Sequence, residues 1–348
     1  MKRFDAAAYF ARRAPRYQNA LKGCPSARVL DLVPYVAALS ASGLEKRKSL
    51  RVCDAFGGTG FLARSLHGNR FSFVVCDCCQ EMLTGALGLP RVGAHVTPDD
   101  FSSAIRVFGG GFFDLVLCHG GLHHVVVLEK ASVDPAESER RQLNVVDRLA
   151  KLVRPGGVII IADIPDKEPP ELDGPLWDQE IEATFLCDCL GNEGLQLVAA
   201  ATGLEAHAQT TLKSIQAALR SKLVKPFRSP VPRLFFDSFV AKETATGHTA
   251  AYVNFDQIHE RLIQDGFLPL GRINYRGPWL FSSANEAGWF FKEKFSAGEP
   301  SAKGADVNSE ANMLDVLQRM LGVRNVTTGV AVNWGVTYGI YQKLEGAK

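Results

Sequence analysis

The sequence predicts an α/β protein built on a parallel sheet that helices cover on both faces. Four short runs, at residues 50–53, 71–76, 113–118 and 158–162, are apolar or nearly so. Helical patterns or glycine-rich turns separate them. Strands that are buried on both faces read as continuous apolar runs, whereas half-exposed strands alternate with polar residues. The succession of such runs and helices therefore favours a covered parallel sheet.

The helices between these strands follow from periodicity and from stop signals. Residues 61–66 and 81–87 are expected to be helical, and Gly88 and Pro90 end the second of these segments. A long helix is expected over residues 137–153, because apolar side chains recur on one of its faces: Leu143, Val146, Leu149 and Leu152. The Arg-Pro-Gly-Gly turn at residues 154–157 ends it.

Beyond residue 163 the pattern changes. Residues 164–176 are rich in Pro, Asp and Glu and predict a loop, and residues 177–225 are mostly helical in pattern. A short helix over residues 255–265 precedes a strand over residues 267–275. Two further helices, at residues 287–295 and 313–321, precede a strand-rich end at residues 330–344, which Gly335 and Gly339 interrupt.

Composition excludes several classes of protein. The 348 residues include 39 Lys and Arg against 37 Asp and Glu, and the net charge of +2 gives no general attraction to nucleic acid. No apolar run reaches the roughly 18 residues that span a bilayer. The basic segment at residues 1–30 is similar to a transit peptide in composition, but a basic helix at the mouth of a site is the interpretation we favour. We expect a soluble, cytoplasmic protein that acts on neither nucleic acid nor membrane.

The eight cysteines indicate reduced thiols rather than a disulfide framework. Cys76, Cys78 and Cys79 crowd the end of one strand, and Cys187 and Cys189 form another close pair. Zinc ligands usually come as two matched pairs with gaps of two to four residues, so we expect no metal site.

A glycine-rich loop offers the first indication of chemistry. The run Asp-Ala-Phe-Gly-Gly-Thr-Gly at residues 54–60 joins a buried strand to a helix, where glycines allow close backbone approach and the helix start presents free N–H groups. Gly58 and Gly60 also satisfy a loose dinucleotide pattern, so a nicotinamide enzyme is an alternative. Asp77, at the end of the second strand, suits either cofactor because a carboxylate can accept both hydroxyls of a ribose.

Further features separate the two interpretations. Asp54 precedes the glycines, where it can orient the loop or meet an ammonium group, and Asp99-Asp100-Phe101 offers an acid and an aromatic ring for an adenine. The runs FDLVLCHGGLHH at residues 113–124 and RPGGVIIIAD at residues 154–163 follow. In this order and spacing, residues 50–165 resemble the class I S-adenosylmethionine-dependent methyltransferases. Residues 12–17 also resemble the helical lid of that family, while Phe56 stands where the family usually has its first glycine.

The resemblance implies a Rossmann-like, seven-stranded methyltransferase fold with an N-terminal helical lid and an inserted cap. It divides the chain into a lid at residues 1–49, a cofactor-binding core at 50–165, a substrate cap at 166–255 and C-terminal strands and helices at 256–348. The last two strands would form an antiparallel pair. The cofactor would be S-adenosylmethionine, the product S-adenosylhomocysteine, and the residues expected at the cofactor are Tyr17, Asp54, Gly58, Gly60, Asp77, Cys78, Met82, Asp100, Phe101 and His119.

Catalytic candidates follow from position at the carboxyl ends of the strands, where open α/β sheets bind ligands. His119, His123 and His124 follow one strand and Asp163 ends the next, and His248 lies on a glycine-bearing loop of the insertion. We expect His123, His248 and Asp163 to act on the acceptor, because a base is needed where the attacking atom must lose a proton. Trp279 and Trp177 are candidates for pocket walls. The basic run at residues 225–233 is most simply a solvated loop.

The sequence therefore predicts a methyltransferase for a small organic acceptor, since a large cap suits a small molecule better than a polymer. Two alternatives remain open at this point: an NAD(P)-dependent oxidoreductase, and a non-catalytic protein that binds the cofactor and regulates a partner. The acceptor, the methylated atom and the oligomeric state are not indicated by any motif.

Overall fold

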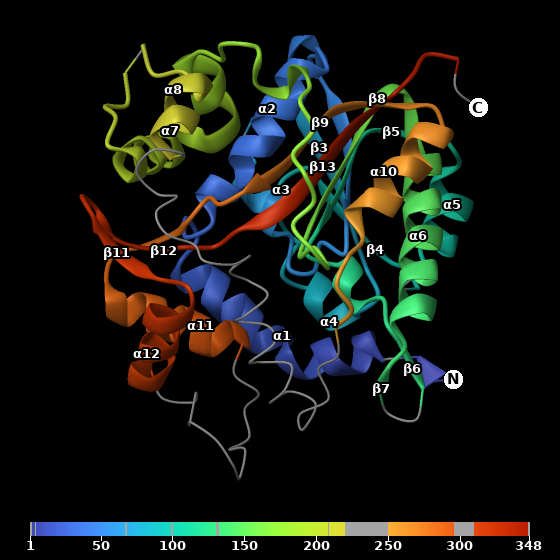
Figure 1. The fold of residues 1–348 in the computed structure, drawn as a ribbon, viewed down its shortest axis with the longest axis horizontal. Helices are drawn as coiled ribbons and strands as arrows, with labels where there is room; N and C mark the ends of the chain where they lie inside the picture. The colour runs from blue at the N-terminus through green and yellow to red at the C-terminus, as the bar shows by residue number, and fades with distance from the viewer. Residues whose placement is uncertain are drawn as a thin grey trace.

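The computed structural model describes residues 2–3, 5–66, 68–98, 100–129, 132–207, 209–219, 250–295 and 310–346 (Figure 1). A seven-stranded sheet with the strand order β4-β3-β2-β5-β8-β13-β9 forms its centre. The strands are β2 (Leu50–Ala55), β3 (Phe71–Asp77), β4 (Val92–Val96), β5 (Phe113–His119), β8 (Val153–Asp163), β9 (Phe267–Tyr275) and β13 (Val336–Lys343).

The sheet is parallel except for one strand. β2 to β5 and β8 pair in parallel, whereas β13 is antiparallel to both of its neighbours, β8 and β9. The prediction of a Rossmann-like, seven-stranded methyltransferase fold is confirmed by this order, and the last two sheet strands are the antiparallel pair that was expected. The carboxyl ends of β2, β3, β5 and β8 consequently lie along one edge of the sheet.

Helices cover both faces of the sheet, as the continuous apolar strands predict. Along β8, Val158 and Ile160 contribute to one core and Ile159 and Ile161 to another, and all four side chains are fully buried. Figure 1 shows α5 (Ser102–Phe108), α6 (Pro135–Leu152) and α10 (Phe255–Gln264) on the face of the sheet that carries Ile159 and Ile161. The opposite face carries α2 (Val33–Ala41), α3 (Phe61–Ser65) and α7 (Ala183–Thr202), and α7 is kinked at Gly191.

Some of the remaining elements lie at the carboxyl edge and others lie in connections or pack on the covering helices. Helix α1 (Ala6–Gly23) runs along it, contacting α4 (Gln80–Leu83) and α11 (Ala284–Phe295). The short 3-10 helices η1 (Val29–Leu32), η2 (Leu44–Lys46), η3 (Leu122–His124) and η4 (Pro175–Trp177) belong to connections. α8 (Leu212–Ala218) packs on α7. β1 (Lys2–Arg3), β6 (Val127–Glu129) and β7 (Ser132–Val133) form a small sheet beside the N-terminus.

The C-terminal part differs from the expected strand-rich run. Residues 330–344 contain two strands in different sheets, because β12 (Gly329–Val332) pairs with β10 (Trp279–Phe281) and β11 (Val323–Val326), whereas β13 belongs to the central sheet. α12 (Glu310–Met320) packs against α11 beside this second small sheet. β4 was not predicted, since it lies at the edge of the sheet and its run VGAHV contains no residue of the buried class. The expected helix at residues 81–87 is shorter and begins at Gln80.

Three further properties bear on the expected class. Among the described residues, no helix is long and apolar enough to span a membrane. All eight cysteines are free thiols, and the described ranges hold no cluster of three or more His, Cys, Asp or Glu side chains arranged for a metal ion. The basic run at residues 225–233 lies outside the described residues.

Candidate functional site

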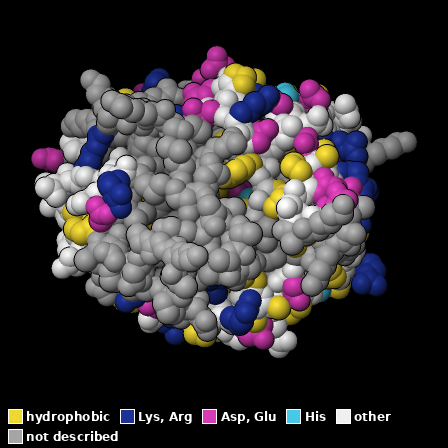
Figure 2. All heavy atoms as spheres, turned by 60° about the horizontal axis from the view of Figure 1, so that its bottom comes forward, with side chains coloured by type: hydrophobic (Ala, Val, Ile, Leu, Met, Phe, Trp, Pro, Cys, Tyr) yellow, Lys and Arg dark blue, Asp and Glu magenta, His cyan; other side chains and the backbone are white. Residues whose placement is uncertain are grey.

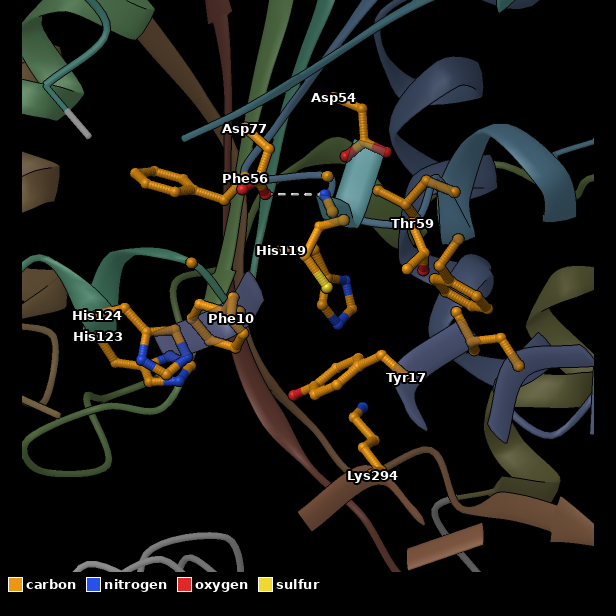
Figure 3. Close-up of a pocket in the computed structure, with 18 of the residues that line it drawn as sticks. Phe10, Tyr17, Asp54, Phe56, Thr59, Asp77, His119, His123, His124 and Lys294 are labelled. Carbon is orange, nitrogen blue, oxygen red and sulfur yellow. Dashed lines mark hydrogen bonds between the residues drawn. The ribbon is translucent and has the colours of Figure 1, made fainter. Parts of the chain in front are cut away.

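A cavity of about 170 Å³ opens at the carboxyl edge of the sheet, under α1. Its walls come from α1, from the loops that follow β2, β3, β5 and β8, and from α11 and the second small sheet. In Figure 3, Asp54 and Asp77 lie on one side of this cavity, His123 and His124 lie beside Phe10, and Tyr17 and Lys294 lie opposite the acids. Segments far apart in sequence thus meet where this fold binds ligands.

The glycine-rich loop has the tight geometry that the sequence predicts. A Cβ atom on Gly57 would lie 2.6 Å from Cγ of Asp54, and Gly58 and Gly60 have φ values of 52° and 75°. The backbone of Phe56 also adopts the left-handed region, at φ 55°, although residues other than glycine rarely do so. Its ring packs edge-on against Phe101, with centroids 4.8 Å apart, and touches the position where Gly121 lacks a side chain. Packing therefore holds Phe56 where the family usually has glycine.

Gly121 and Phe56 should be energetically coupled. A Cβ atom on Gly121 would lie 2.3 Å from Cβ of Phe56, so we expect Gly121→Ala to reduce the free energy of unfolding by about 1–3 kcal/mol. Phe56→Gly relieves the positive φ but removes ring contacts. Because the clash disappears with the ring, urea unfolding of the double variant should show a loss smaller than the sum of the two single losses by at least about 0.5 kcal/mol. Additive losses would contradict the contact.

Asp77 presents a buried carboxylate at the end of β3. Its Oδ2 accepts the Gly58 N–H at 3.0 Å and its Oδ1 accepts the Cys79 N–H at 2.9 Å. Burial raises the pKa of Asp77 to about 6, although these backbone bonds oppose the shift. Each carboxylate oxygen can accept a second hydrogen bond, so the group is oriented by the protein and still able to accept from a ligand.

Asp54 is buried at the opposite side of the same loop, and no described residue donates a hydrogen bond to its Oδ2. Burial, and then the nearby charge of Asp77, raise the pKa of Asp54 to about 8 against the opposing effect of Arg28. A buried carboxylate oxygen without a partner is costly unless a ligand supplies a donor. Since Asp54 lines the cavity, a cationic donor in that cavity would satisfy it.

Arg28 and His119 form a hydrogen-bonded chain on the cavity wall. Arg28 donates from Nη2 to His119 Nε2 at 2.9 Å and from Nε to Asp31 Oδ2 at 2.9 Å. Because a guanidinium cannot accept, Nε2 of His119 is the acceptor and Nδ1 carries the proton that faces the Tyr35 hydroxyl at 2.6 Å. Burial, then the charge of Arg28, lowers the pKa of His119 well below its usual value. His119 is therefore a neutral wall residue whose lone pair is occupied.

A lysine side chain lies near Arg28 and Asp31. Lys294 of α11 has its Nζ 4.3 Å from the ring centroid of Trp279, and burial lowers the pKa of Lys294. Trp279 donates from Nε1 to both carboxylate oxygens of Asp31, at 3.1 and 3.2 Å, and stacks on Trp334 with centroids 4.3 Å apart. This corner thus combines a guanidinium, a lysine amine, one carboxyl group and two stacked indole rings.

His123 and Asp163 form a buried pair at the carboxyl ends of β5 and β8. His123 Nδ1 lies 2.6 Å from Asp163 Oδ1, and the exposed fractions are 6% and 0%. Asp163 also accepts the N–H groups of Leu122 and Ile164, at 2.9 and 2.8 Å, which fix its orientation. A carboxylate that accepts from Nδ1 holds an imidazole in the tautomer whose Nε2 can take a proton. The sequence predicts both residues as catalytic, and the structure brings them together.

Aromatic side chains of α1 close one side of the cavity. Phe10 packs edge-on against His124, with centroids 4.8 Å apart, and Tyr17 packs edge-on against Phe10 at 6.1 Å. The ring centroids of His123 and His124 are 3.9 Å apart. Phe10 of α1 therefore lies beside His123 and His124, as Figure 3 shows.

Not every predicted residue reaches the cavity. Those that line it are Tyr17, Asp54, Gly58, Asp77, Cys78, Met82, His119, His123, His124, Asp163 and Trp279. Gly60 serves packing instead, since a Cβ atom there would lie 2.8 Å from Cβ of Ala86. Asp100 and Phe101 do not line the cavity. Hydrogen bonds from Ser102, and then the ion pair with Arg148 at 2.7 Å, lower the pKa of Asp100 to about 2 against the effect of burial, while Phe101 is fully buried in the core. Trp177 lines a different cavity, and His248 lies outside the described residues.

Sequence reasoning missed several lining residues, including Arg28, Lys294, Trp334 and Phe10. Arg28 follows α1 and Lys294 belongs to α11, so neither stands in a motif. Lys294 lies in the charged run Lys-Glu-Lys at residues 292–294, which the sequence gives no reason to place in a site. Only the tertiary arrangement places them beside Asp31 and Trp279.

Comparison with known proteins gives similarity at the level of structure. No family model and no curated protein sequence matches the chain. The similar solved structures are mostly class I methyltransferases, although identities are low. They include YcgJ from Bacillus subtilis, at 12% identity over 90% of this chain and 99% of that one, with a TM-score of 0.40. An O-methyltransferase family protein from Burkholderia thailandensis is 14% identical, and the match covers 91% of this chain and 56% of that one, with a TM-score of 0.40. The [4+2]-cyclase SpnF is 14% identical, and the match covers 92% of this chain and 81% of that one, with a TM-score of 0.43.

Proposed function

We propose that the protein is an S-adenosylmethionine-dependent methyltransferase that acts on a small organic acceptor. The observation that supports this most strongly is the buried, unsatisfied carboxylate of Asp54 beside the glycine-rich loop, with Asp77 across the loop and Arg28 near enough to lower the pKa of Asp54. An acid and a cation at one end of a cavity suit the ammonium and carboxylate groups of an amino acid. A second acid suits a ribose diol.

The lining residues divide the proposed cofactor site into three parts. Asp77 accepts the ribose hydroxyls, Asp54 accepts the ammonium group, and Arg28, with Lys294, attracts the carboxylate. Gly57 and Gly58 let the loop pack closely on the cavity wall, because a Cβ atom on Gly57 would lie 2.6 Å from Cγ of Asp54 and one on Gly58 would lie 3.0 Å from Cε of Met82. Tyr17 and Met82 form apolar walls, and Cys78 follows Asp77 at the rim.

The chemistry requires a methyl donor and a prepared acceptor. When bound, S-adenosylmethionine supplies the methyl group from its sulfonium sulfur. His123 receives the proton of an acceptor hydroxyl at Nε2, while Asp163 stabilises the resulting imidazolium through Nδ1. Phe10 and the lid exclude water from the histidines, which favours transfer to the acceptor over side reactions. His119, being neutral and hydrogen-bonded, positions rather than transfers a proton.

The walls favour a small acceptor. Helix α1 covers the histidines, and aromatic side chains enclose the corner formed by Trp279 and Trp334. Where side chains are described on the face seen in Figure 2, Lys and Arg lie interspersed with Asp and Glu, and the net charge of the whole sequence is only +2. A nucleic-acid substrate would favour a basic stripe. We therefore propose a small molecule, and the predicted division into lid, core and cap remains part of this proposal.

A thermal-shift comparison tests the proposed cofactor against the nicotinamide alternative. We expect S-adenosylhomocysteine and S-adenosylmethionine to raise the Tm by several degrees at 1 mM, since a ligand at 100 times its Kd adds about 2.7 kcal/mol. NADH and NADPH should leave the Tm unchanged, because the acids Asp54 and Asp77 flank the glycine-rich loop, where the pyrophosphate of a dinucleotide would have to lie. A shift with NADH alone would contradict the proposal.

A further inference from the structure

A second cavity lies between the loop after β8, helix α8 and the end of β9, away from the glycine-rich loop. Its volume is about 350 Å³, and its lining residues are Glu171, Trp177, Gln216, Leu219, Ile273, Asn274, Tyr275 and Arg276. None of these residues lines the first cavity. Tyr275 packs edge-on against Tyr338, with centroids 5.8 Å apart, and Tyr338 packs in the same way on His119 at 6.0 Å. A layer of aromatic rings thus separates the two cavities.

The walls of the second cavity are held in place without a ligand. The Leu172 N–H donates to the Arg272 carbonyl at 2.9 Å, and Asn274 Nδ2 donates to the Pro169 carbonyl at 2.9 Å, so the loop after β8 is fixed on β9. Asn274 also donates its N–H to Glu171 Oε1 at 3.1 Å. On the opposite wall, a capping box between Thr211 and Ser214 begins α8. Preformed walls are typical of small-molecule sites.

Three buried polar groups of this cavity have no hydrogen-bond partner among the described residues: Nε1 of Trp177, Nε2 of Gln216 and the hydroxyl of Tyr275. They come from three separate segments. Gln216 is only 8% exposed. An indole N–H can only donate, and an amide nitrogen also donates. Burial raises the pKa of Tyr275 well above its usual value, so its hydroxyl keeps its proton and can donate too.

These three buried donors are unfavourable without a ligand, because a buried donor that lacks a hydrogen-bond partner costs free energy. The walls between the donors are apolar, with Leu219 and Ile273 at 4% and 5% exposure. We propose that the second cavity binds a small organic ligand that combines an apolar body with acceptor oxygens, as an aromatic carboxylate or ester does. This site stands apart from the proposed methyl-transfer site and does not depend on it.

Ligand-observed NMR on the full chain tests this site, with benzoate, methyl benzoate and toluene as probes. We expect saturation transfer to benzoate and methyl benzoate, and at least a 3-fold weaker signal for toluene, which lacks acceptor oxygens. Benzoate and the ester distinguish a charged from a neutral acceptor. Gln216→Leu and Tyr275→Phe should each reduce the oxygenated probes' signal by at least 3-fold, because each variant removes one donor at similar volume.

Two controls make the result decisive. Tyr341→Phe removes another buried hydroxyl without a described partner, outside this cavity, and should leave binding unchanged. The Tm values of Gln216→Leu and Tyr275→Phe should equal or exceed that of the unmodified protein by about 1–3 °C, since an unsatisfied group is lost. No binding of either oxygenated probe at millimolar concentration, binding that both variants retain, or displacement by S-adenosylhomocysteine would each overturn the proposal.

Discussion

Replacing His123 by Gln should reduce the rate of methyl transfer to a hydroxylated acceptor by about 10²- to 10⁴-fold, the usual contribution of a general base. The reason is the pair that His123 forms with Asp163, 2.6 Å apart and buried at the carboxyl edge of the sheet. Glutamine occupies similar space and can still donate a hydrogen bond to Asp163, but it cannot take a proton. Transfer from radiolabelled S-adenosylmethionine to an acceptor of the unmodified protein measures the loss.

The pH profile separates a base from a structural residue. In the His123→Gln variant the rate should rise with pH up to the pKa of the acceptor hydroxyl, because solvent then removes the proton. Affinity for S-adenosylhomocysteine should stay within about 2-fold of the unmodified protein. His259→Gln, on α10 and away from the cavity, is the matched control and should retain full activity. A His123→Gln variant with full activity and an unchanged pH profile would show that the acceptor needs no base from this residue.

Replacing Asp54 by Asn should stabilise the ligand-free protein while weakening cofactor binding. Burial raises the pKa of Asp54 to about 8 from an ordinary value of 3.8. Between these values the folded state holds a proton that the unfolded state has released, so this group's contribution to stability declines as pH rises from about 4 to 8. Asparagine removes that decline. We expect the Tm of the variant to exceed that of the unmodified protein by an amount that grows from pH 5 to pH 8.

Binding should show the opposite trend. An ammonium group favours ionised Asp54, so affinity of the unmodified protein for S-adenosylhomocysteine should fall as pH decreases from 8 to 6.5, by at most about 10-fold per pH unit. Calorimetric titrations of Asp54→Asn should show affinity that is about 10- to 100-fold lower at pH 8 and nearly flat over this range. Asp147→Asn, which alters an ion pair with Arg261 outside the cavity, is the control. Unchanged affinity in Asp54→Asn would place the ammonium group elsewhere.

Much of the fold could be predicted because its strands are buried on both faces. Val158–Asp163 and the other central strands are apolar runs whose burial leaves little choice of structure, and β9 has the bounds expected from the sequence. β4 was missed because an edge strand with half-exposed residues carries no such signal. The run at residues 330–344 could not be divided between two sheets, since strand patterns alone do not indicate pairing partners.

The candidate site was predictable where a motif fixes the backbone. Asp54, Asp77 and the glycines follow strand ends, and the parallel sheet brings them together. Phe101 shows the limit of this reasoning: it has the expected place in the chain, but it turns into the core, where Phe56 fills the space beside it. Arg28 and Lys294 could not be identified, because their position depends on how α1 and α11 pack over the sheet.

The most direct test of the proposed function is an isothermal titration of the full chain with S-adenosylhomocysteine at pH 8, repeated with Asp77→Ala. Asp77 accepts two backbone N–H groups and faces the cavity, so it tests the ribose site independently of the acceptor. We predict 1:1 binding with a micromolar or lower Kd, and a loss of at least about 10-fold in the variant. Absence of binding by the unmodified protein would contradict the assignment of this cavity to S-adenosylmethionine.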